Sequence, residues 1–475
     1  MIDRREVMEF SREFGLAANV IEKDYVLGWL LAGIAAHLEL GLAWAFKGGT
    51  CLKKCYFETY RFSEDLDFTL TSSEHLDQAF LEGAFRKIAE WIYEASGIEV
   101  PADAIRFEVY ENKRGGKSAE GRIGYRGPMG RRGDPARIKL DLTTDEVLVL
   151  DPAQREVNHP YSDKPDADIH VRCYAFEEVF AEKIRALAER ERPRDLYDVV
   201  HLYRHDELRP DRSLVFATLE QKCAYKGIAV PTFAVLENQP QRVELEAEWK
   251  NMLAHQLPVL PPFQQFWEEL PAVFDWLHGL AEKAVLPAAP AVSGVRYAAW
   301  RPPSMAQAWH TSAPLEVIRF AAANHLCVSL TYQGSTRLIE PYSLRRSSEG
   351  NLLLIAIKHQ TGETRSYRID RIQSAEASQQ TFVPRYAIEL TPSGPITAPE
   401  ISRRATGIAR PGRSVSGRRR RIIGRPLSSG PKYVFECSLC GKRFTRKSHN
   451  PALNPHKDKQ GFPCPGRTGL FVAMK

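Results

Sequence analysis

Hydrophobic positions along the chain follow two periods, and the changes between them divide the sequence into regions. Apolar residues recur at helical spacing in 21–38 and 265–283, which predicts helices there. Strict alternation of apolar and polar residues in 65–70 and 137–144 predicts strands with one buried face. We therefore expect residues 1–285 to form an α/β domain, a mixed sheet with helices and a helical C-terminal half.

Beyond residue 285 the pattern changes again. Residues 286–314 are rich in Pro, Ala and Ser and indicate a linker. One helical start followed by short β-rich runs predicts a small β-barrel domain in 315–390. Residues 391–430 are typical of a basic flexible linker, and 431–475 contain a cysteine cluster that predicts a zinc finger.

Charge is distributed unevenly along the chain. From residue 403 to the end, 18 Lys or Arg face Glu436 and Asp458, a net charge of +16. Because the whole chain carries +6, the first 402 residues carry about −10. A basic tail on an acidic body predicts a polyanionic partner for the tail.

The cellular compartment of the protein can be predicted from its apolar segments and its cysteines. No run approaches the roughly 20 apolar residues that span a bilayer, and the first residues lack the apolar core of a signal peptide. We expect a cytoplasmic protein without membrane contact. Five scattered cysteines are interpreted as ordinary core thiols, namely Cys51, Cys55, Cys173, Cys223 and Cys327.

Two aspartates share one face of the strand predicted in 65–70. Asp65 and Asp67 are two residues apart, so their carboxylates lie side by side and repel each other. Such a pair is tolerated at a solvent-facing strand edge and is useful where a divalent cation bridges it. If the strand of 137–144 is a neighbour, Asp141 adds a third carboxylate to this face.

A glycine turn and a lysine accompany the aspartates. Gly48, Gly49 and Thr50 precede a predicted helix, whose first backbone N–H groups can hold phosphate oxygens. Lys183 falls within the apolar stripe of a helix predicted in 176–190, so it either snorkels to solvent or meets a buried anion. Asp195 and Asp198 lie on one side of the next helix, where either can pair with this lysine.

Together these segments resemble a known family. The spacing of GGT, fourteen residues, D-x-D and a later strand aspartate resembles the polymerase-β-like nucleotidyltransferase superfamily. More narrowly, residues 10–285 resemble the AbiEii-type nucleotidyltransferase toxins of bacterial type IV toxin–antitoxin and abortive-infection systems. The segments that carry this resemblance are VIEKDYVLGWLL, FKGGTCLKK, RFSEDLDF, IKLDL, EEVFAEKIRALAER and RDLYDVVHL.

The resemblance implies transfer of a nucleoside monophosphate from an NTP to an acceptor, which for relatives is the 3′ end of tRNA. It also implies a cognate antitoxin and a role in phage defence. Carried over by position, the Mg²⁺ ligands are Asp65, Asp67 and Asp141, and the phosphates are held by Gly48, Gly49 and Thr50. Lys183 contacts the triphosphate. Asp198 completes the site, with Asp195 as the second candidate.

Residues 315–385 resemble the WYL domain of bacterial regulators and defence proteins, through segments such as LIEPYSL and TRSYRIDRI. The chain departs from that family at its name tripeptide, where it has Leu352, Leu353 and Leu354. The resemblance implies an Sm-like barrel that binds a nucleotide or nucleic acid. The candidate contacts are Arg365, Arg368 and Arg371, which can equally face solvent or pair with Asp370 and Glu340.

The last segment contains a set of metal-ligand residue types. Cys437 and Cys440 form a C-x2-C pair, followed by His456 and Cys464, which suits a tetrahedral structural Zn²⁺. His449 is the rival histidine. The Arg-rich run of 403–425 is either a solvated tail or a nucleic-acid contact. Contact is favoured by the aromatic residues of the basic zinc module, Phe435, Phe444 and Phe462.

The leading hypothesis is therefore a metal-dependent nucleotidyltransferase toxin that acts on RNA. Two alternatives remain: transfer of the nucleoside monophosphate to a protein hydroxyl, and a nucleic-acid-binding regulator in which the transferase fold is inert. The sequence does not choose the NTP, the tRNA species or the antitoxin.

Overall fold

The computed structural model describes residues 1–111, 115–130, 133–165, 168–205, 210–240, 242–298, 315–390, 433–437, 439–446, 451–454, 456–457, 463–464 and 466–474. The chain divides into two compact units, Met1–Pro399 and Glu400–Lys475. Of the second unit, only the segments from residue 433 onward belong to the described part of the chain. No helix of the described residues is both long and apolar enough to span a membrane.

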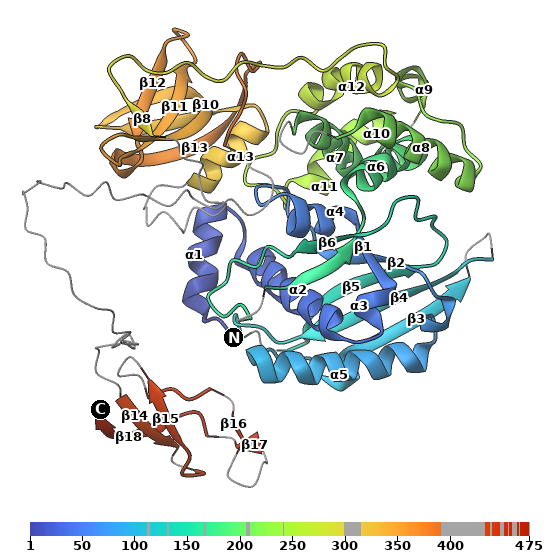
Figure 1. The fold of residues 1–475 in the computed structure, drawn as a ribbon, viewed down its shortest axis with the longest axis vertical. Coiled ribbons are helices and arrows are strands. Elements are labelled where there is room, and N and C mark those ends of the chain that lie inside the picture. The colour runs from blue at the N-terminus through green and yellow to red at the C-terminus, as the bar shows by residue number, and fades with distance from the viewer. Residues whose placement is uncertain are drawn as a thin grey trace, which may run out of the picture. The chain divides into compact units, whose positions relative to one another are not determined.

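A mixed seven-stranded sheet organises the N-terminal part of the first unit (Figure 1), in the order β3-β4-β5-β2-β1-β7-β6. β2 runs parallel to β5 and antiparallel to β1, and β1 runs parallel to β7. The strands are β1 (Trp44–Lys47), β2 (Asp65–Leu70), β3 (Ile105–Glu111), β4 (Lys117–Tyr125), β5 (Ala136–Thr143), β6 (Ala153–Glu156) and β7 (His170–Cys173). The alternation in the sequence correctly predicted β2 and β5.

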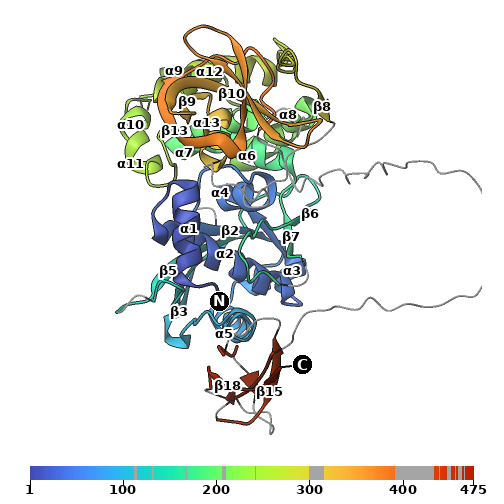
Figure 2. The same ribbon diagram turned by 90° about the vertical axis from the view of Figure 1, so that its left-hand side faces the viewer.

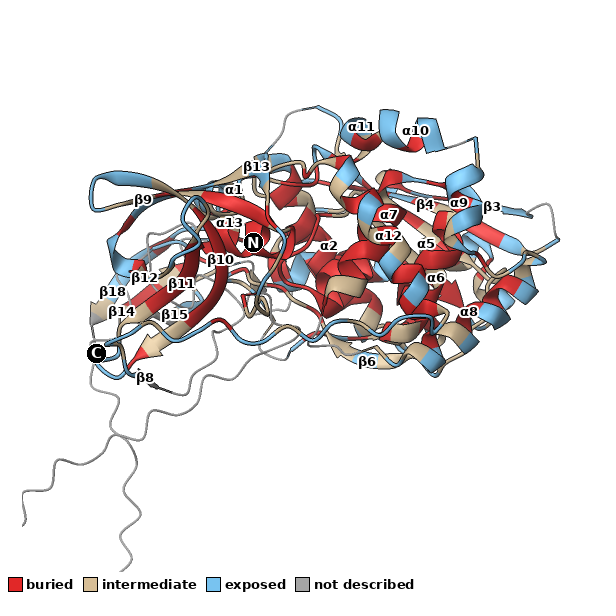
Figure 3. Cartoon of the chain, turned by 90° about the horizontal axis from the view of Figure 1, so that it is seen from above, coloured by how far each residue is buried: buried red, intermediate tan, exposed pale blue. Residues whose placement is uncertain are grey.

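The sheet is flanked by helices whose sequences match their burial. The predicted helix of 21–38 is α2 (Ala18–Ala36), whose residues are buried almost without interruption from Val20 to Ile34 (Figure 3). It packs against α1 (Arg4–Phe14) and α5 (Gln78–Ser96), and α5 also contacts β3. Along the chain, α3 (Leu40–Ala43) follows α2 and leads into β1.

After β1 the chain enters α4 (Gly48–Cys51) and continues as one π-helical segment, Leu52–Tyr56. This confirms the helix predicted after the glycine turn. The remaining helices of this part are grouped together in Figure 1. They are α6 (Phe176–Arg190), α7 (Pro193–Arg204), α8 (Arg212–Lys226), α9 (Phe233–Asn238), α10 (Arg242–Ala247), α11 (Trp249–Leu253) and α12 (Phe263–Leu277).

A second, antiparallel sheet follows in the same unit, in the order β12-β11-β10-β9-β13, with β8 paired to β10. Its helix α13 (Leu315–Ala323) contacts β9, β10 and β13 (Figure 2). α13 also contacts α1 of the first sheet domain. The strands are β8 (Tyr297–Ala298), β9 (Leu326–Tyr332), β10 (Ser335–Ser347), β11 (Leu352–Lys358), β12 (Thr364–Arg368) and β13 (Ile372–Thr381).

The described part of the second unit contains two small antiparallel sheets. One has the order β15-β14-β18, and the other pairs β16 with β17. Their strands are β14 (Tyr433–Cys437), β15 (Arg443–Arg446), β16 (His456–Lys457), β17 (Pro463–Cys464) and β18 (Gly469–Met474). The basic run 403–425, Phe462 and His449 lie outside the described residues.

Candidate active site

The three candidate carboxylates come together through strand register. In the parallel β2–β5 pair, Asp67 lies opposite Asp141, and Asp65 lies opposite Lys139. Because side chains alternate along a strand, the three aspartates lie on one face of the sheet. Lys139 Nζ donates to Asp141 Oδ2 at 3.0 Å. The register therefore places Asp141 next to the D-x-D pair.

Burial and mutual repulsion make this face electrostatically unfavourable for three free carboxylates. Burial raises the pKa of Asp67 to about 6, and the neighbouring charges of Asp141 and Asp65 act in the same direction, against Lys47 and Lys183. Burial also raises the pKa of Asp65, again with a contribution from Asp141. Additional positive charge at this face would stabilise the ionised carboxylates.

The glycine turn lies directly against Asp67. Gly48 has φ +78°, and a Cβ on it would lie 2.2 Å from Asp67 Oδ2. A Cβ on Gly49 would lie 2.4 Å from Arg61 Nη2. Thr50 donates its hydroxyl hydrogen bond to the carbonyl oxygen of Asp65. At Gly48 the left-handed backbone and the nearby Asp67 carboxylate both favour glycine, whereas at Gly49 a side chain would have to displace the Arg61 guanidinium.

Lys183 is buried, with 7% of its surface exposed, and meets carboxylates instead of snorkelling to solvent. Its Nζ lies 3.1 Å from Asp195 Oδ1 and 2.8 Å from Asp198 Oδ2. Despite burial, these two carboxylates raise the pKa of Lys183, and its charge acts on Asp67 as well. The structure thus brings the candidate lysine and both candidate helix aspartates together.

Two arginines complete this buried ion network. Arg61 donates from Nε and Nη2 to the two oxygens of Asp198, each at 2.7 Å. Arg190 donates in the same way to Asp195, at 2.7 and 2.9 Å. Against the effect of burial, Lys183 and these arginines hold the pKa of Asp195 below its usual value and that of Asp198 well below it. Bidentate arginines of this kind fix carboxylate orientation as well as charge.

Two basic residues of the site were not predicted. Lys47 lies opposite Asp67 in the β1–β2 register, and its Nζ is 3.4 Å from Glu182 Oε1. The positive charge of Arg194 acts to lower the pKa of Asp65, against the effect of burial. Its buried Nε has no hydrogen-bond partner among the residues that the structure describes. The signals were present in the sequence, since Lys47 directly precedes the glycine turn and Arg194 directly precedes Asp195.

The donor set fits a hard divalent cation. Carboxylate oxygens are the ligands Mg²⁺ prefers, and because burial raises the pKa of Asp65 and Asp67, a cation at this face would favour their ionised form. The oxygens of Asp65, Asp67 and Asp141 do not all lie within 4.8 Å of one another. A shared ion would therefore require a small movement of these side chains, beginning with release of Asp141 from Lys139.

The C-terminal cluster brings four ligand atoms together. Those of Cys437, Cys440, His456 and Cys464 all lie within 4.8 Å of one another, as a zinc site requires. Cys440 Sγ lies 3.2 Å from His456 Nε2. Nδ1 of the same ring lies 2.9 Å from the carbonyl oxygen of Asn454, a contact that orients a metal-binding imidazole.

The candidate arginines of the second sheet have acidic neighbours. Arg368 donates to both oxygens of Asp370, at 3.0 and 2.7 Å, and Arg365 pairs with Glu363. Glu340 pairs instead with His359 and Arg385, each at 2.9 Å. For Arg368, the pairing with Asp370 that the sequence left open is therefore the one observed.

The comparisons with known proteins fit this geometry. Residues 29–275 match the family model of the nucleotidyl transferase AbiEii toxin, type IV toxin–antitoxin system, and residues 314–377 match the WYL domain. The first match covers more than half of the chain. The protein therefore belongs to the AbiEii nucleotidyltransferase toxins, a family that implies an NTP substrate and a cognate antitoxin. No curated protein matches the chain.

Several solved structures are similar to this chain at low identity. The nucleotidyltransferase toxin MenT4 of Mycobacterium tuberculosis H37Rv is 17% identical, with a TM-score of 0.41, over 59% of this chain and 91% of that one. JHP933 from Helicobacter pylori is 16% identical, with a TM-score of 0.35, over 56% and 94%. A putative nucleotidyltransferase from H. pylori has the same identity and TM-score, over 56% and 100%.

Proposed function

We propose that this toxin transfers a nucleoside monophosphate from an NTP to an RNA, and that the acceptor is the 3′ end of tRNA. The observation that carries the proposal is the register of β2 and β5, which sets Asp67 beside Asp141 with the glycine turn against them. In this proposal the carboxylate face binds the metal ion, and the glycine turn at its edge binds the phosphates.

In this proposal, Asp65, Asp67 and Asp141 hold Mg²⁺, which supplies charge neutralisation of the triphosphate when bound. Asp141 would assist in activating the attacking ribose hydroxyl, whose oxygen bonds to the α-phosphorus while the bond to the pyrophosphate leaving group breaks. Lys183 contributes positive charge beside Asp67, and Asp195 and Asp198 hold its ammonium in place. Gly48, Gly49 and Thr50 would offer the phosphates backbone N–H groups at the start of a helix.

Arg194 is the residue we add for the NTP. Its guanidinium is partly buried near Asp65, and the Nε without a partner is a donor of the kind that a phosphate oxygen satisfies. The RNA acceptor is supported by the +16 charge of residues 403–475. A tail with that charge binds phosphate backbones with little dependence on sequence.

The test is direct. Full-length protein is incubated with Mg²⁺, total bacterial RNA and each of four labelled NTPs, and RNA 3′ ends are then sequenced. We expect added nucleotides at tRNA 3′ ends, and none with Asp65→Asn. Label in protein that resists nuclease would replace the acceptor by a protein hydroxyl. Absence of labelled product together with operator-specific DNA binding would contradict the proposal.

A further inference from the structure

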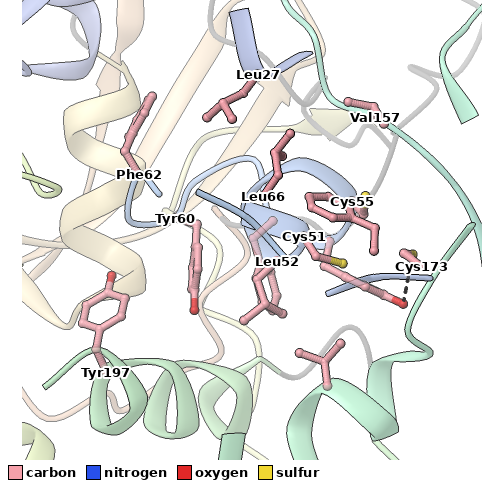
Figure 4. Close-up of a cluster of buried hydrophobic side chains, with 14 of the residues drawn as sticks. Leu27, Cys51, Leu52, Cys55, Tyr60, Phe62, Leu66, Val157, Cys173 and Tyr197 are labelled. Carbon is pink, nitrogen blue, oxygen red and sulfur yellow. Dashed lines mark hydrogen bonds between the residues drawn. The ribbon is translucent and has the colours of Figure 1, made fainter. Parts of the chain in front are cut away.

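Three buried cysteines meet behind the glycine turn. The Sγ atoms of Cys51, Cys55 and Cys173 all lie within 4.8 Å of one another. Figure 4 shows the three thiols close together among buried apolar side chains. They come from α4, from the π-helical segment and from the end of β7, so 118 residues separate the last two along the chain. Only the tertiary structure makes them a group.

A positively charged arginine lies beside this cluster. Arg155 on β6 places its guanidinium 4.5 Å from the ring centroid of Tyr56, whose hydroxyl is 4.0 Å from Cys173 Sγ. The Nε of Arg155 is buried and has no hydrogen-bond partner among the described residues. A buried cationic group in this position is stabilised if negative charge develops on the neighbouring sulfurs.

The cluster also has a route to solvent. Cys55, Tyr56 and Arg155 are among the residues that line a cavity of about 410 Å³. An entry path is one of the features that a metal site requires, besides the right ligands at bonding separations. Cys223 and Cys327 are buried as well, but each lies outside this group.

We propose that Cys51, Cys55 and Cys173 bind one divalent thiophilic cation of the Zn²⁺ type. Thiolates select such soft ions over Mg²⁺. Binding releases three thiol protons to solvent, and three thiolates around a dication leave one net negative charge, which Arg155 offsets. The ion ties the helix that follows Gly48–Thr50 to β7 and so holds the turn against the sheet.

Metal content and ¹¹³Cd NMR of full-length protein test this site. Protein purified without chelator is assayed by mass spectrometry for bound metal, and a second sample is reconstituted with ¹¹³Cd²⁺. A three-sulfur site and the three-sulfur, one-nitrogen site at Cys437, Cys440, His456 and Cys464 give separate signals. We expect Cys173→Ser to lose about one equivalent of metal and the three-sulfur signal.

Matched variants assign the signals. Cys223→Ser, which removes a buried thiol outside the cluster, is expected to lose neither signal. Cys440→Ser is expected to lose only the other one. If Cys173→Ser does not fold, the three-sulfur signal is compared between Cys55→Ser, which should lack it, and the wild-type protein, which should show it. A wild-type protein without a three-sulfur signal, or alkylation that reveals a disulfide among the three cysteines, would overturn the proposal. These readouts do not depend on transferase activity.

Discussion

At the scale of single residues, Asp67 is a candidate catalytic residue whose ionisation lowers the stability of the folded state. Its pKa is raised to about 6, above the 3.8 of a free side chain. Between these values the folded state binds more protons than the unfolded chain, so ionisation of Asp67 lowers stability as pH rises from about 4 to 6. Its contribution is most favourable below this window and is lost above it.

Asp67→Asn should therefore stabilise the protein at pH 7.5 and abolish transfer. We expect the free energy of unfolding of the variant, relative to wild type, to increase by about 2 kcal/mol between pH 4 and pH 7.5. Urea unfolding at the two values measures this. A constant difference between variant and wild type across that range would show that the carboxyl titrates normally.

A second prediction at this scale follows from the close approach of Gly48 to Asp67. Gly48→Ala forces a Cβ onto the Asp67 carboxylate and strains φ +78°, so activity should fall by at least tenfold. Gly227→Ala is the matched control, because Gly227 has φ +69° and open space around its missing Cβ. Both variants should lose about 1 kcal/mol of stability from backbone strain. Only Gly48→Ala should lose activity, and equal transfer rates for the two variants would contradict the contact.

At the scale of elements, α6 and α7 are joined by the buried network around Lys183. Asp195 and Asp198 are fully buried, so removal of the ammonium leaves them with less compensation. Lys183→Met should reduce the free energy of unfolding by about 3 kcal/mol and eliminate transfer. Lys164→Met, at a half-exposed pair with Asp168, serves as control in the same urea titration and should change stability little. A stable but inactive Lys183→Met would show that the network is not needed for folding.

The segment Glu58–Arg61 connects the WYL region to this network. Thr59 donates to Glu316 of α13 at 3.1 Å, and Arg319 of α13 lies 3.5 Å from Glu58. The next two residues after Thr59, Tyr60 and Arg61, both donate to Asp198. We therefore expect a change at α13 to act, through one short loop, on a carboxylate that holds Lys183.

Arg319→Met tests this connection. The substitution removes the buried cation that pairs with both Glu58 and Glu316, so we expect about 3 kcal/mol of destabilisation in thermal unfolding. Transfer activity of the remaining folded protein should fall too, because Arg61 loses its support. Arg365→Met, at an exposed pair in the same region, should do neither. Full activity in folded Arg319→Met would rule out the connection.

At the scale of the whole molecule, the charge separation between the tail and the rest of the chain leads to a prediction about the proposed RNA binding. Replacing Arg418 to Arg421 by Gln removes four charges from the tail. The slope of log K against log salt for RNA should become shallower by about 3, with NTP binding unchanged. Fluorescence anisotropy at several salt concentrations measures the slope. An unchanged slope would place the RNA contact elsewhere.

The sequence by itself determined the elements and the residue types of the candidate site. Strand alternation predicted β2 and β5, helical periodicity predicted α2, α6 and α12, and the order of motifs indicated the AbiEii family. These features are local, since they depend on periodicity and spacing within about twenty residues. Asp65 and Asp67 were identifiable because two carboxylates side by side on one strand face repel each other, and Lys183 because a charge within an apolar helix stripe is costly without a partner.

Only the tertiary structure decided which residues meet. Strand register set Lys47 opposite Asp67, chain reversal brought Arg61 to Asp198, and β7 carried Cys173 to two cysteines that the sequence had suggested were ordinary core thiols. The physical reason is that such contacts depend on strand register and on packing between segments that lie from 20 to 137 residues apart. Local hydrophobic patterns contain no information about that distance.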